Sequence, residues 1–384
     1  MNDLSVLVGE KPASAGQAHR IVAIHDPMEL VHYVPLWEQL VDQAAEPNVF
    51  YTPWALIPAI HHLSNGQAVR VLLFFRDGEG TVLDGVLPLF EKRCIGPFVT
   101  LHGYRHRYCF SAEPLVCRGR EREVAASFVA WLSRRRLRYP LLTLRGLDVA
   151  GVWYQALSQA MQVQGVQYHQ TEPVQRALLQ ITDGGLDVFQ ERIPAKKRKE
   201  YARLKERLAQ LGELQIDVLA PEAADLHEWL DDFIALELKG WKGREGTALG
   251  SRPECRLFFE RIARAAHERG QLVMARMRVG GRPVAMLCDL LAPPGRYAFK
   301  TAYDEDFSRY APGVLLEIEN AHLTFQSPRG VEWLDSCAAP DNALLNRLYP
   351  HRRTLVDITV CARAVAHAGL WLKQLRQKSR RAAS

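Results

Sequence analysis

The chain has 384 residues, of which 48% are hydrophobic, a share typical of globular proteins. No apolar run reaches the ~18 residues of a membrane span, and the seven scattered cysteines include no CxxC pair, which argues against a disulfide framework or a zinc site. The net charge of +6 comes from residues 361–384, which are basic and lack acidic side chains, so no nucleic-acid-binding surface is expected on the body of the fold.

Residues 1–19 are expected to form a flexible tail, and residues 20–182 a first domain. The first 18 residues lack a basic start followed by an apolar run, so no signal peptide is predicted and the protein is expected in the cytoplasm. Periodicity predicts these elements of the first domain in chain order: a strand from Arg20, a helix around 34–41, two strands joined at the Asp77–Gly80 turn, a loop and extended piece over 101–117, a helix over 120–136, a buried strand over 139–147, a helix over 152–165 and strand-like material over 167–181.

A second domain is predicted over residues 187–360, followed by a basic C-terminal helix or tail over residues 361–384. Its expected elements are a helix over 194–212, a strand over 214–220, helices over 221–241 and 254–270, two strands around the Gly280–Gly281 turn, a strand over 296–303, a helix over 312–325, a strand over 331–337, a short helix near 342–348 and a strand over 353–360. The first half has a looser version of this order, and each half is expected to bury a core of its own.

The stretch from Phe299 to Phe325 organises the second half. Alternation places Tyr297, Phe299, Thr301 and Tyr303 on one strand face. Helical spacing then predicts an apolar stripe along the following helix: Val314, Ile318, Ala321 and Phe325. The unpaired amides at the start of this helix favour an anion, and Gly313 would let a phosphate approach while Arg309 grips it. The alternative is an ordinary strand-to-helix connection with solvated charges.

The order of elements in the second half is that of an acyl-CoA N-acyltransferase (GNAT) domain. The chain resembles the CelD-like GNAT acetyltransferases associated with polysaccharide biosynthesis, which are related in fold to the FemAB peptidyltransferases. The stretches that carry the resemblance are AKKRKEYARLKERL, LELKGWKGREGTAL, YDEDFSRYAPGVLLEIENAH and GVEWLDSCAAPDNALLNRLYPHRRTL. The resemblance implies an α/β fold with two tandem GNAT-like domains, each a mixed sheet flanked by helices.

The same resemblance implies acetyl-CoA or another acyl-CoA as co-substrate, without a metal. The residues implied to bind it surround the turn before the helix: Arg309, Tyr310, Gly313, Val314 and Leu315. The usual GNAT signature for the pyrophosphate is Gln/Arg-x-x-Gly-x-Gly/Ala. Here Pro312 stands where its first glycine would be, which removes one amide from the turn.

Acyl transfer to an amine needs a proton acceptor, donors for the carbonyl oxygen and help for the leaving thiolate. Glu237 extends the apolar stripe of its helix, and Asp335 follows two large apolar residues on one strand face, so both are candidates for the base. The alternatives are a solvated Glu237 at a helix end and an Asp335 paired for structural reasons. Tyr303 is the candidate acid beside the sulfur, and aromatic packing is its alternative role.

Substrate contacts are predicted in the polar loop that contains Trp241 and Lys242, and at Lys300 on the central strand. Lys300 either points into the groove between the halves or is an ordinary solvated lysine. The acceptor is expected to be an amine on a small molecule or a glycan, such as an amino sugar or a polysaccharide precursor.

Three functions are compatible with these residues. The first is N-acyl transfer from acyl-CoA, the second is a FemAB-type transfer from aminoacyl-tRNA, and the third is a catalytically silent accessory role in exopolysaccharide assembly. The neutral body of the chain argues against tRNA, which demands many phosphate contacts. The tail from Cys361, with Trp371 and its basic residues, predicts a weak peripheral contact with the anionic inner membrane; the alternative is that its apolar side packs on the second domain.

Overall fold

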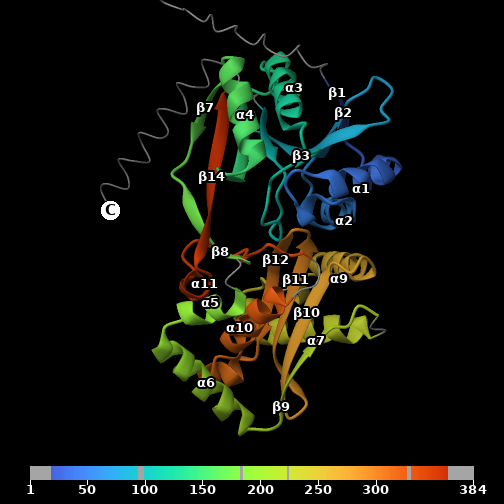
Figure 1. Ribbon diagram of the computed structural model, residues 1–384. Helices are drawn as coiled ribbons and strands as arrows, with labels where there is room; N and C mark the ends of the chain where they lie inside the picture. Colours follow the sequence, from blue (N-terminus) through green and yellow to red (C-terminus); the bar gives the residue numbers. More distant parts are fainter. Residues whose placement is uncertain (1–18, 94–98, 182–184, 223–224, 327–329, 362–384) are drawn as a thin grey trace, which may run out of the picture.

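The computed structural model describes residues 19–93, 99–181, 185–222, 225–326 and 330–361 (Figure 1). The predicted membrane contact of the C-terminal tail lies outside the described residues, apart from Cys361. No helix in these ranges is long and apolar enough to cross a bilayer.

The first half of the chain alternates strands and helices in the predicted order. Its strands are β1 (Arg20–Ile24), β2 (Val69–Phe75), β3 (Leu83–Arg93), β4 (Val99–Gly103), β5 (Leu115–Val116), β6 (Leu141–Asp148), β7 (Gln167–Gln170) and β8 (Val174–Gln180). Its helices are α1 (Val34–Gln43), α2 (Pro53–Leu63), α3 (Glu121–Arg134) and α4 (Val152–Val163), with 3-10 turns η1 (Glu29–Tyr33) and η2 (Val49–Tyr51).

The second half repeats the order of one strand, a helical pair, three strands and a helix. Its strands are β9 (Leu214–Val218), β10 (Leu272–Val279), β11 (Arg282–Ala292), β12 (Gly295–Tyr303), β13 (Trp333–Asp335) and β14 (His351–Cys361). Its helices are α5 (Gly185–Arg192), α6 (Ala195–Ala209), α7 (Leu226–Lys239), α8 (Trp241–Arg244), α9 (Pro253–Glu268), α10 (Pro312–Phe325) and α11 (Ala343–Leu348), with 3-10 turns η3 (Leu249–Ser251) and η4 (Glu305–Tyr310).

The elements expected from periodicity are confirmed, but the sequence analysis missed the short helices α5 and α8 and the longer helix α2. Its sequence, PWALIPAIHHL, is apolar almost all round and contains Pro58, so it shows neither an amphipathic period nor an uninterrupted helical pattern. The helix forms because it is buried on nearly every side, where it packs against α9 of the other half. Tertiary contact therefore decides its conformation.

All the strands belong to one mixed sheet of 14 strands, which confirms the predicted mixed α/β architecture flanked by helices. Its main path runs β1-β2-β3-β4-β6-β14-β8-β13-β12-β11-β10-β9, with β5 paired to β3 and β7 paired to β14. β8, from the first half, pairs with β13 of the second, and β14, from the second half, pairs with β6 of the first. The halves thus exchange their last strands, and Figure 1 shows β14 in red running from the lower lobe into the upper one.

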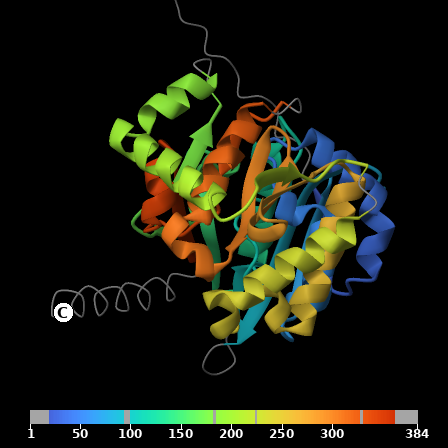
Figure 2. The same ribbon diagram turned by 90° about the horizontal axis from the view of Figure 1, so that it is seen from below.

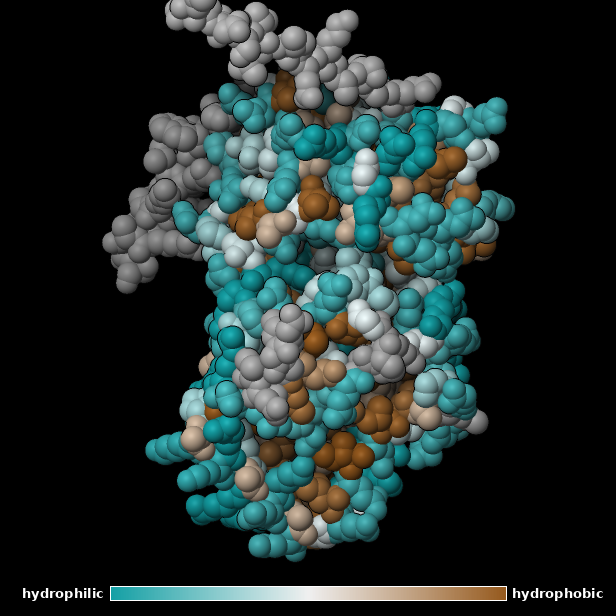
Figure 3. Space-filling view, viewed as in Figure 1, coloured by the Kyte–Doolittle hydropathy of each residue, from teal (hydrophilic) through white to brown (hydrophobic). Residues whose placement is uncertain are grey.

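Helices cover both faces of each lobe (Figures 1 and 2). Alternate residues of β10 and β11 belong to different clusters: Met274, Met286 and Cys288 pack with α7 and α9, whereas Ala275 and Leu287 pack with α6 and α10. The period of two thereby gives the sheet two buried faces. In the hydropathy view, the side facing the viewer is mostly hydrophilic with scattered apolar groups on both lobes (Figure 3).

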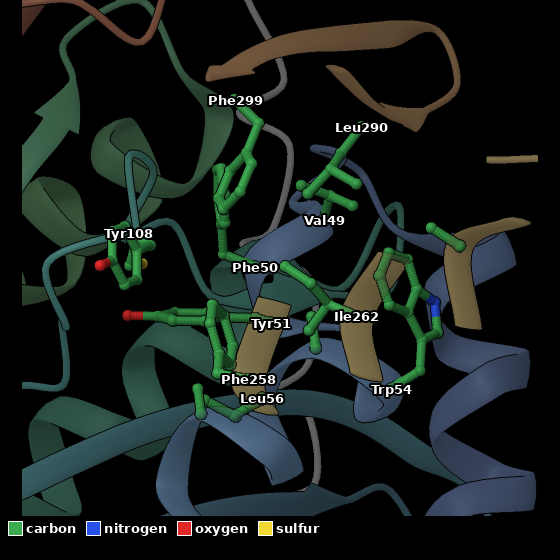
Figure 4. Packing of buried hydrophobic residues seen from close by; sticks show 14 of the residues in the cluster. Val49, Phe50, Tyr51, Trp54, Leu56, Tyr108, Phe258, Ile262, Leu290 and Phe299 are labelled. Atoms are coloured by element: carbon green, nitrogen blue, oxygen red, sulfur yellow. The ribbon is translucent and has the colours of Figure 1, made fainter. Parts of the chain in front are cut away.

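The expectation that each half buries its own core is wrong for one face of the sheet. A single cluster contains Phe50 and Trp54 from the first half together with Phe258, Ile262 and Phe299 from the second. These side chains interdigitate in Figure 4, where Phe50 lies near Phe299 and Phe258 lies near Leu56. Because the apolar faces of α2 and α9 are each covered by the other half, the two lobes are held in a fixed relation by a shared core.

β12 carries a bulge that overturns the predicted arrangement of its side chains. Tyr297 is opposite Leu290 and Lys300 is opposite Cys288, so four residues of β12 face three of β11. The extra residue turns Lys300 to the same face as Tyr297, and it places Thr301 and Tyr303 on the opposite, α10 face. A strict alternation over Arg296–Tyr303 could not predict this change of face.

Candidate functional site

A cavity of about 560 Å³ opens where β12 and β13 separate. The two strands pair in parallel only from Gly295 to Tyr297, opposite Trp333–Asp335. From there to Tyr303, β12 stays paired with β11 but its other edge no longer pairs with β13. The cavity is lined by residues 298–301 of β12, by residues 336–338 after β13, and by Tyr108 and Phe110 from a loop of the first half. Both halves therefore build its walls.

The main chain of Thr301 faces this cavity. The Asp304 amide donates to the Val284 carbonyl, which shows that even-numbered residues at this end of β12 bond to β11. Thr301 then points its main-chain groups the other way, and its carbonyl accepts a hydrogen bond from Lys242 Nζ at 2.8 Å. Because the pairing with β13 ends at Tyr297, no strand within the described ranges takes up the Thr301 amide, which remains available to a carbonyl oxygen in the cavity.

Glu317 is the carboxylate that lines the cavity. It projects from α10, its residue is only 4% exposed, and its Oε1 accepts a hydrogen bond from the Tyr349 hydroxyl. Burial, and secondarily the charge of Asp289, raises the pKa of Glu317 to about 7. A carboxyl with this pKa can accept a proton at neutral pH and is held in place by its tyrosine partner.

Sequence reasoning missed Glu317 because it assigned the wrong stripe to α10. The residues that the helix buries are Pro312, Leu315, Leu316, Glu317, Asn320, Ala321 and Thr324, whereas Val314 and Ile318 are only partly buried. A signal was present in the sequence, since Glu317, Asn320 and Thr324 repeat at spacings of three and four residues along an otherwise apolar helix. Polar side chains with that spacing share one face.

A buried network anchors this polar face to the sheet. The Arg296 Nε donates to Asp289 Oδ2 at 2.8 Å, and Asn320 Nδ2 donates to the same oxygen at 2.9 Å. All three residues are at most 2% exposed. Since a buried charge is tolerated only when paired, the network fixes the rotation of α10 and so directs Glu317.

Glu237 is buried, and the solvated alternative for it is wrong. Its Oε1 accepts hydrogen bonds from Lys300 Nζ and from Lys242 Nζ, the latter at 3.3 Å, and its Oε2 accepts from the Leu249 amide at 2.7 Å. The cavity boundary includes both lysines but not the Glu237 carboxylate. Glu237 therefore positions the two lysines, and its lone pairs are already engaged.

Lys300 is likewise largely buried, and the solvated alternative for it is wrong. Its side chain is 9% exposed, lines the cavity and lies over the ring of Tyr108 at 5.0 Å from the centroid. Burial lowers the pKa of Lys300, and the adjacent Glu237 partly opposes that effect. Lys242 and Trp241 also line the cavity, so the three predicted substrate-binding residues are brought together.

The loop that carries Trp241 is tied to the end of β12. Glu305 accepts a hydrogen bond from the Trp241 amide at 2.7 Å and forms an ion pair with Arg244 at 2.8 Å. Trp241 is still 44% exposed, so its ring lies at the rim of the cavity.

Asp335 lies at the end of β13, behind the cavity wall. Its Oδ2 binds Arg353 Nη1 at 2.7 Å and lies 3.6 Å from Arg176 Nη1, while its Oδ1 accepts the Cys337 amide at 2.8 Å. The residue is fully buried. Both carboxylate oxygens are already engaged by partners within the fold, so this geometry corresponds to the structural alternative for Asp335.

The predicted phosphate turn is more closed than the sequence implies. Tyr310 and Leu315 are buried in the core, and the amides of Val314 and Leu315 already donate to the Ala311 carbonyl. Pro312 has no amide, so Gly313 offers the free N–H among the first residues of α10 that the structure describes. The exposed Arg309 lies over the ring of Tyr310, 4.8 Å from its centroid.

Two features shape the approach to this turn. Ala311 is in the left-handed region, with φ 51° and ψ 49°, a conformation that costs a non-glycine residue about 1–2 kcal/mol. A Cβ added to Gly313 would lie 3.3 Å from the ring of Tyr303, which packs here and does not line the cavity. Tyr303 therefore supports the turn. It does not line the cavity, where the predicted acid would have to lie.

No metal site accompanies these groups: within the described ranges, no three His, Cys, Asp or Glu side chains are arranged to hold an ion.

Comparison with known sequences identifies part of the chain. Residues 195–342, which extend from α6 to the start of α11, match the family model of the acetyltransferase (GNAT) domain. No curated protein matches the sequence. The matched segment contains β12, the turn and α10, and therefore contains most of the cavity.

Solved structures with the same fold cover both halves. FemX is 12% identical, covers 88% of this chain and 96% of its own, and has a TM-score of 0.51. The structure of L-PGS from Bacillus licheniformis is 13% identical, covers 91% and 97%, and also has a TM-score of 0.51. A protein of unknown function from Bacteroides thetaiotaomicron is 10% identical, covers 85% and 97%, and has a TM-score of 0.53. At these identities the similarity concerns the fold alone, and it extends over both halves of the chain, whereas the match to a GNAT domain covers residues 195–342.

Proposed function

We propose that this protein is an N-acyltransferase that moves an acyl group from acyl-CoA to an amine. The observation that carries the proposal is the juxtaposition of the free edge of β12 with the Glu317 carboxyl in one cavity. The match of residues 195–342 to a GNAT acetyltransferase domain supports a transferase. An acetyl donor and an amino sugar or polysaccharide precursor as acceptor are the specific form of the proposal, and the resemblance to CelD-like proteins motivates it.

The turn can hold the phosphates of the donor, with Gly313 supplying an amide and Arg309 a charge-assisted hydrogen bond. The Thr301 amide faces the cavity and can donate to the thioester oxygen as that oxygen gains charge. Glu317 would accept the proton that the attacking amine loses. The new carbon–nitrogen bond forms as the carbon–sulfur bond breaks, and the ammonium of Lys300 in the cavity favours the departing thiolate.

The proposal is tested by titrating the protein with acetyl-CoA and by following thiol release with a panel of amines. We expect saturable acetyl-CoA binding and thiol release that depends on the amine. A chain that binds neither acyl-CoA nor aminoacyl-tRNA would instead be the catalytically silent accessory protein.

We predict that Arg309→Ala weakens acetyl-CoA binding by about 1.5–3 kcal/mol, the range for a charge-assisted hydrogen bond, which is roughly 10- to 150-fold in the dissociation constant. Isothermal titration measures the change. Arg203→Ala, which removes an exposed arginine on α6, is the control and should leave the affinity unchanged. Equal affinities for acetyl-CoA in all three proteins would remove Arg309 from the donor site.

Transfer of an aminoacyl group from tRNA is the second candidate, because the match with FemX covers nearly the whole of both chains. The same thiol assay separates the two candidates when paired with a filter-binding measurement on aminoacyl-tRNA. Tight, salt-dependent tRNA binding without acetyl-CoA binding would favour the second candidate.

A further inference from the structure

A second cavity, of about 590 Å³, lies in the first half and shares no lining residue with the acyl cavity. We name it the basic groove. It is bounded by the turn after α2 at residues 65–68, the end of β3, the end of β4 and β6. Its volume is within the range of small-molecule sites and far exceeds that of a single water or ion.

Four cationic residues from three segments of the chain line the groove. Lys92 and Arg93 end β3, Arg105 follows β4, and Arg145 lies on β6. A cleft lined by charges of one sign concentrates counter-ions and raises the local concentration of an oppositely charged ligand.

These charges are not balanced by carboxylates of the fold. Glu91, the acidic residue in the groove lining, already accepts hydrogen bonds from Arg70, from Tyr139 at 2.5 Å and from Arg138 at 3.2 Å. Arg145 lies 3.8 Å from Asp357, at the outer limit of an ion pair. Within the part of the chain that the structure describes, the other three cations have no acidic partner.

Several other arginines of the fold do have acidic partners. Arg296 is paired with Asp289, Arg353 with Asp335 and Asp148, and Arg276 with Asp232 at 2.6 Å. These three arginines are neutralised within the fold, whereas Lys92, Arg93 and Arg105 of the groove are not neutralised by any described residue.

The floor of the groove is aromatic and uncharged. Phe90 and His102 stack with ring centroids 5.2 Å apart, and both rings are partly exposed. The Thr100 hydroxyl is hydrogen-bonded to His102 Nε2 at 2.9 Å. Burial, with a smaller effect of Arg145, lowers the pKa of His102 to about 4, so this ring is neutral at pH 7 and offers a flat surface rather than a further charge.

We propose that the basic groove binds a phosphate-bearing ligand whose ring lies against Phe90 and His102. Guanidinium groups bind phosphate oxygens in pairs of parallel hydrogen bonds, and the exposed Arg145 provides such a group. Arg105, whose Nη2 donates to the Cys109 carbonyl at 3.2 Å, adds a positive charge beside it. A ligand that combines phosphates with a flat ring satisfies both the charge and the floor. This inference does not depend on the acyl transfer proposed for the other cavity.

The test uses ADP as the probe and isothermal titration of the full chain. Arg145→Ala and Lys92→Glu should each weaken ADP binding at least about tenfold, and raising the salt concentration should weaken it further. Arg136→Ala, an exposed arginine of the same half outside the groove, is the matched control and should change nothing. Circular dichroism of each variant confirms that the fold is retained.

Because ADP resembles part of CoA, Arg309→Ala is measured alongside. Binding that survives Arg309→Ala and is lost in the groove variants supports the proposal, whatever the outcome with acetyl-CoA. Binding that is lost in Arg309→Ala and retained in both groove variants overturns it, as does the absence of ADP binding by the unmodified protein at low salt.

Discussion

Glu317→Gln is expected to lower turnover at least about 100-fold, the lower end of the effect of a general base. The amide keeps the shape of the side chain and can still accept the Tyr349 hydroxyl, but it cannot take a proton from the amine. The measurement is thiol release at saturating donor and acceptor. Glu319→Gln, on the same helix but outside the cavity and paired with Lys205 at 2.8 Å, is the control and should remain active.

The pH dependence gives a second measurement of the same role. Because the pKa of Glu317 is raised to about 7, the unmodified protein should gain activity as the pH rises through 7, and the glutamine variant should lose this dependence. A raised carboxyl pKa also means that Glu317 favours the folded state at low pH and that this contribution is lost as the pH rises through about 7. The variant should therefore unfold no more easily than the original protein at pH 8.

These outcomes separate catalysis from folding. A variant that is stable but inactive identifies Glu317 as the base, and a variant with normal rate and pH profile shows that water or another group takes the proton. In that second case Glu237 and Asp335, the carboxylates predicted from sequence, would have to be tested next.

Asp335→Asn is expected to lower the free energy of unfolding by about 3 kcal/mol, measured by chemical denaturation. Neutralising Asp335 leaves the largely buried Arg353 and Arg176 without their shared carboxylate, and breaking a buried pair typically costs 3–5 kcal/mol. The lower end applies because Asp148 still lies 3.2 Å from Arg353.

The control is Asp231→Asn, which removes an exposed carboxylate paired with Arg256 at 2.7 Å and should cost at most about 1 kcal/mol. Turnover per folded molecule should fall less in Asp335→Asn than in Glu317→Gln. If Asp335→Asn instead keeps its full stability and loses turnover, Asp335 is the base that the sequence pattern indicated.

The order of elements could be predicted from sequence because local patterns specify it. The short apolar runs of β2 and β3, the DGEG turn between them and the amphipathic period of α7 and α9 depend on neighbours within a few residues. The strand, turn and helix around Gly313 were predictable for the same reason, whereas the convergence of Trp241, Lys242 and Lys300 on one cavity depends on packing and on the bulge in β12. α2 was not predictable either, because an apolar helix with an internal proline is stable only against α9.

The tertiary structure alone decided which partners the charged side chains have. Glu237 and Asp335 each lie on an apolar face, a pattern compatible with both a catalytic base and a structural ion pair. Which of these roles each carboxylate has depends on lysines and arginines that are distant in the sequence. The exchange of β8 and β14, the shared core and the bulge in β12 are likewise long-range, since a strand's own residues do not specify which edge it joins. Glu317 acquires its pKa of about 7 from burial that only the packed α10 provides. The sequence thus determined the fold and the location of the candidate site. Packing determined which carboxylate in that site can act as the proposed base.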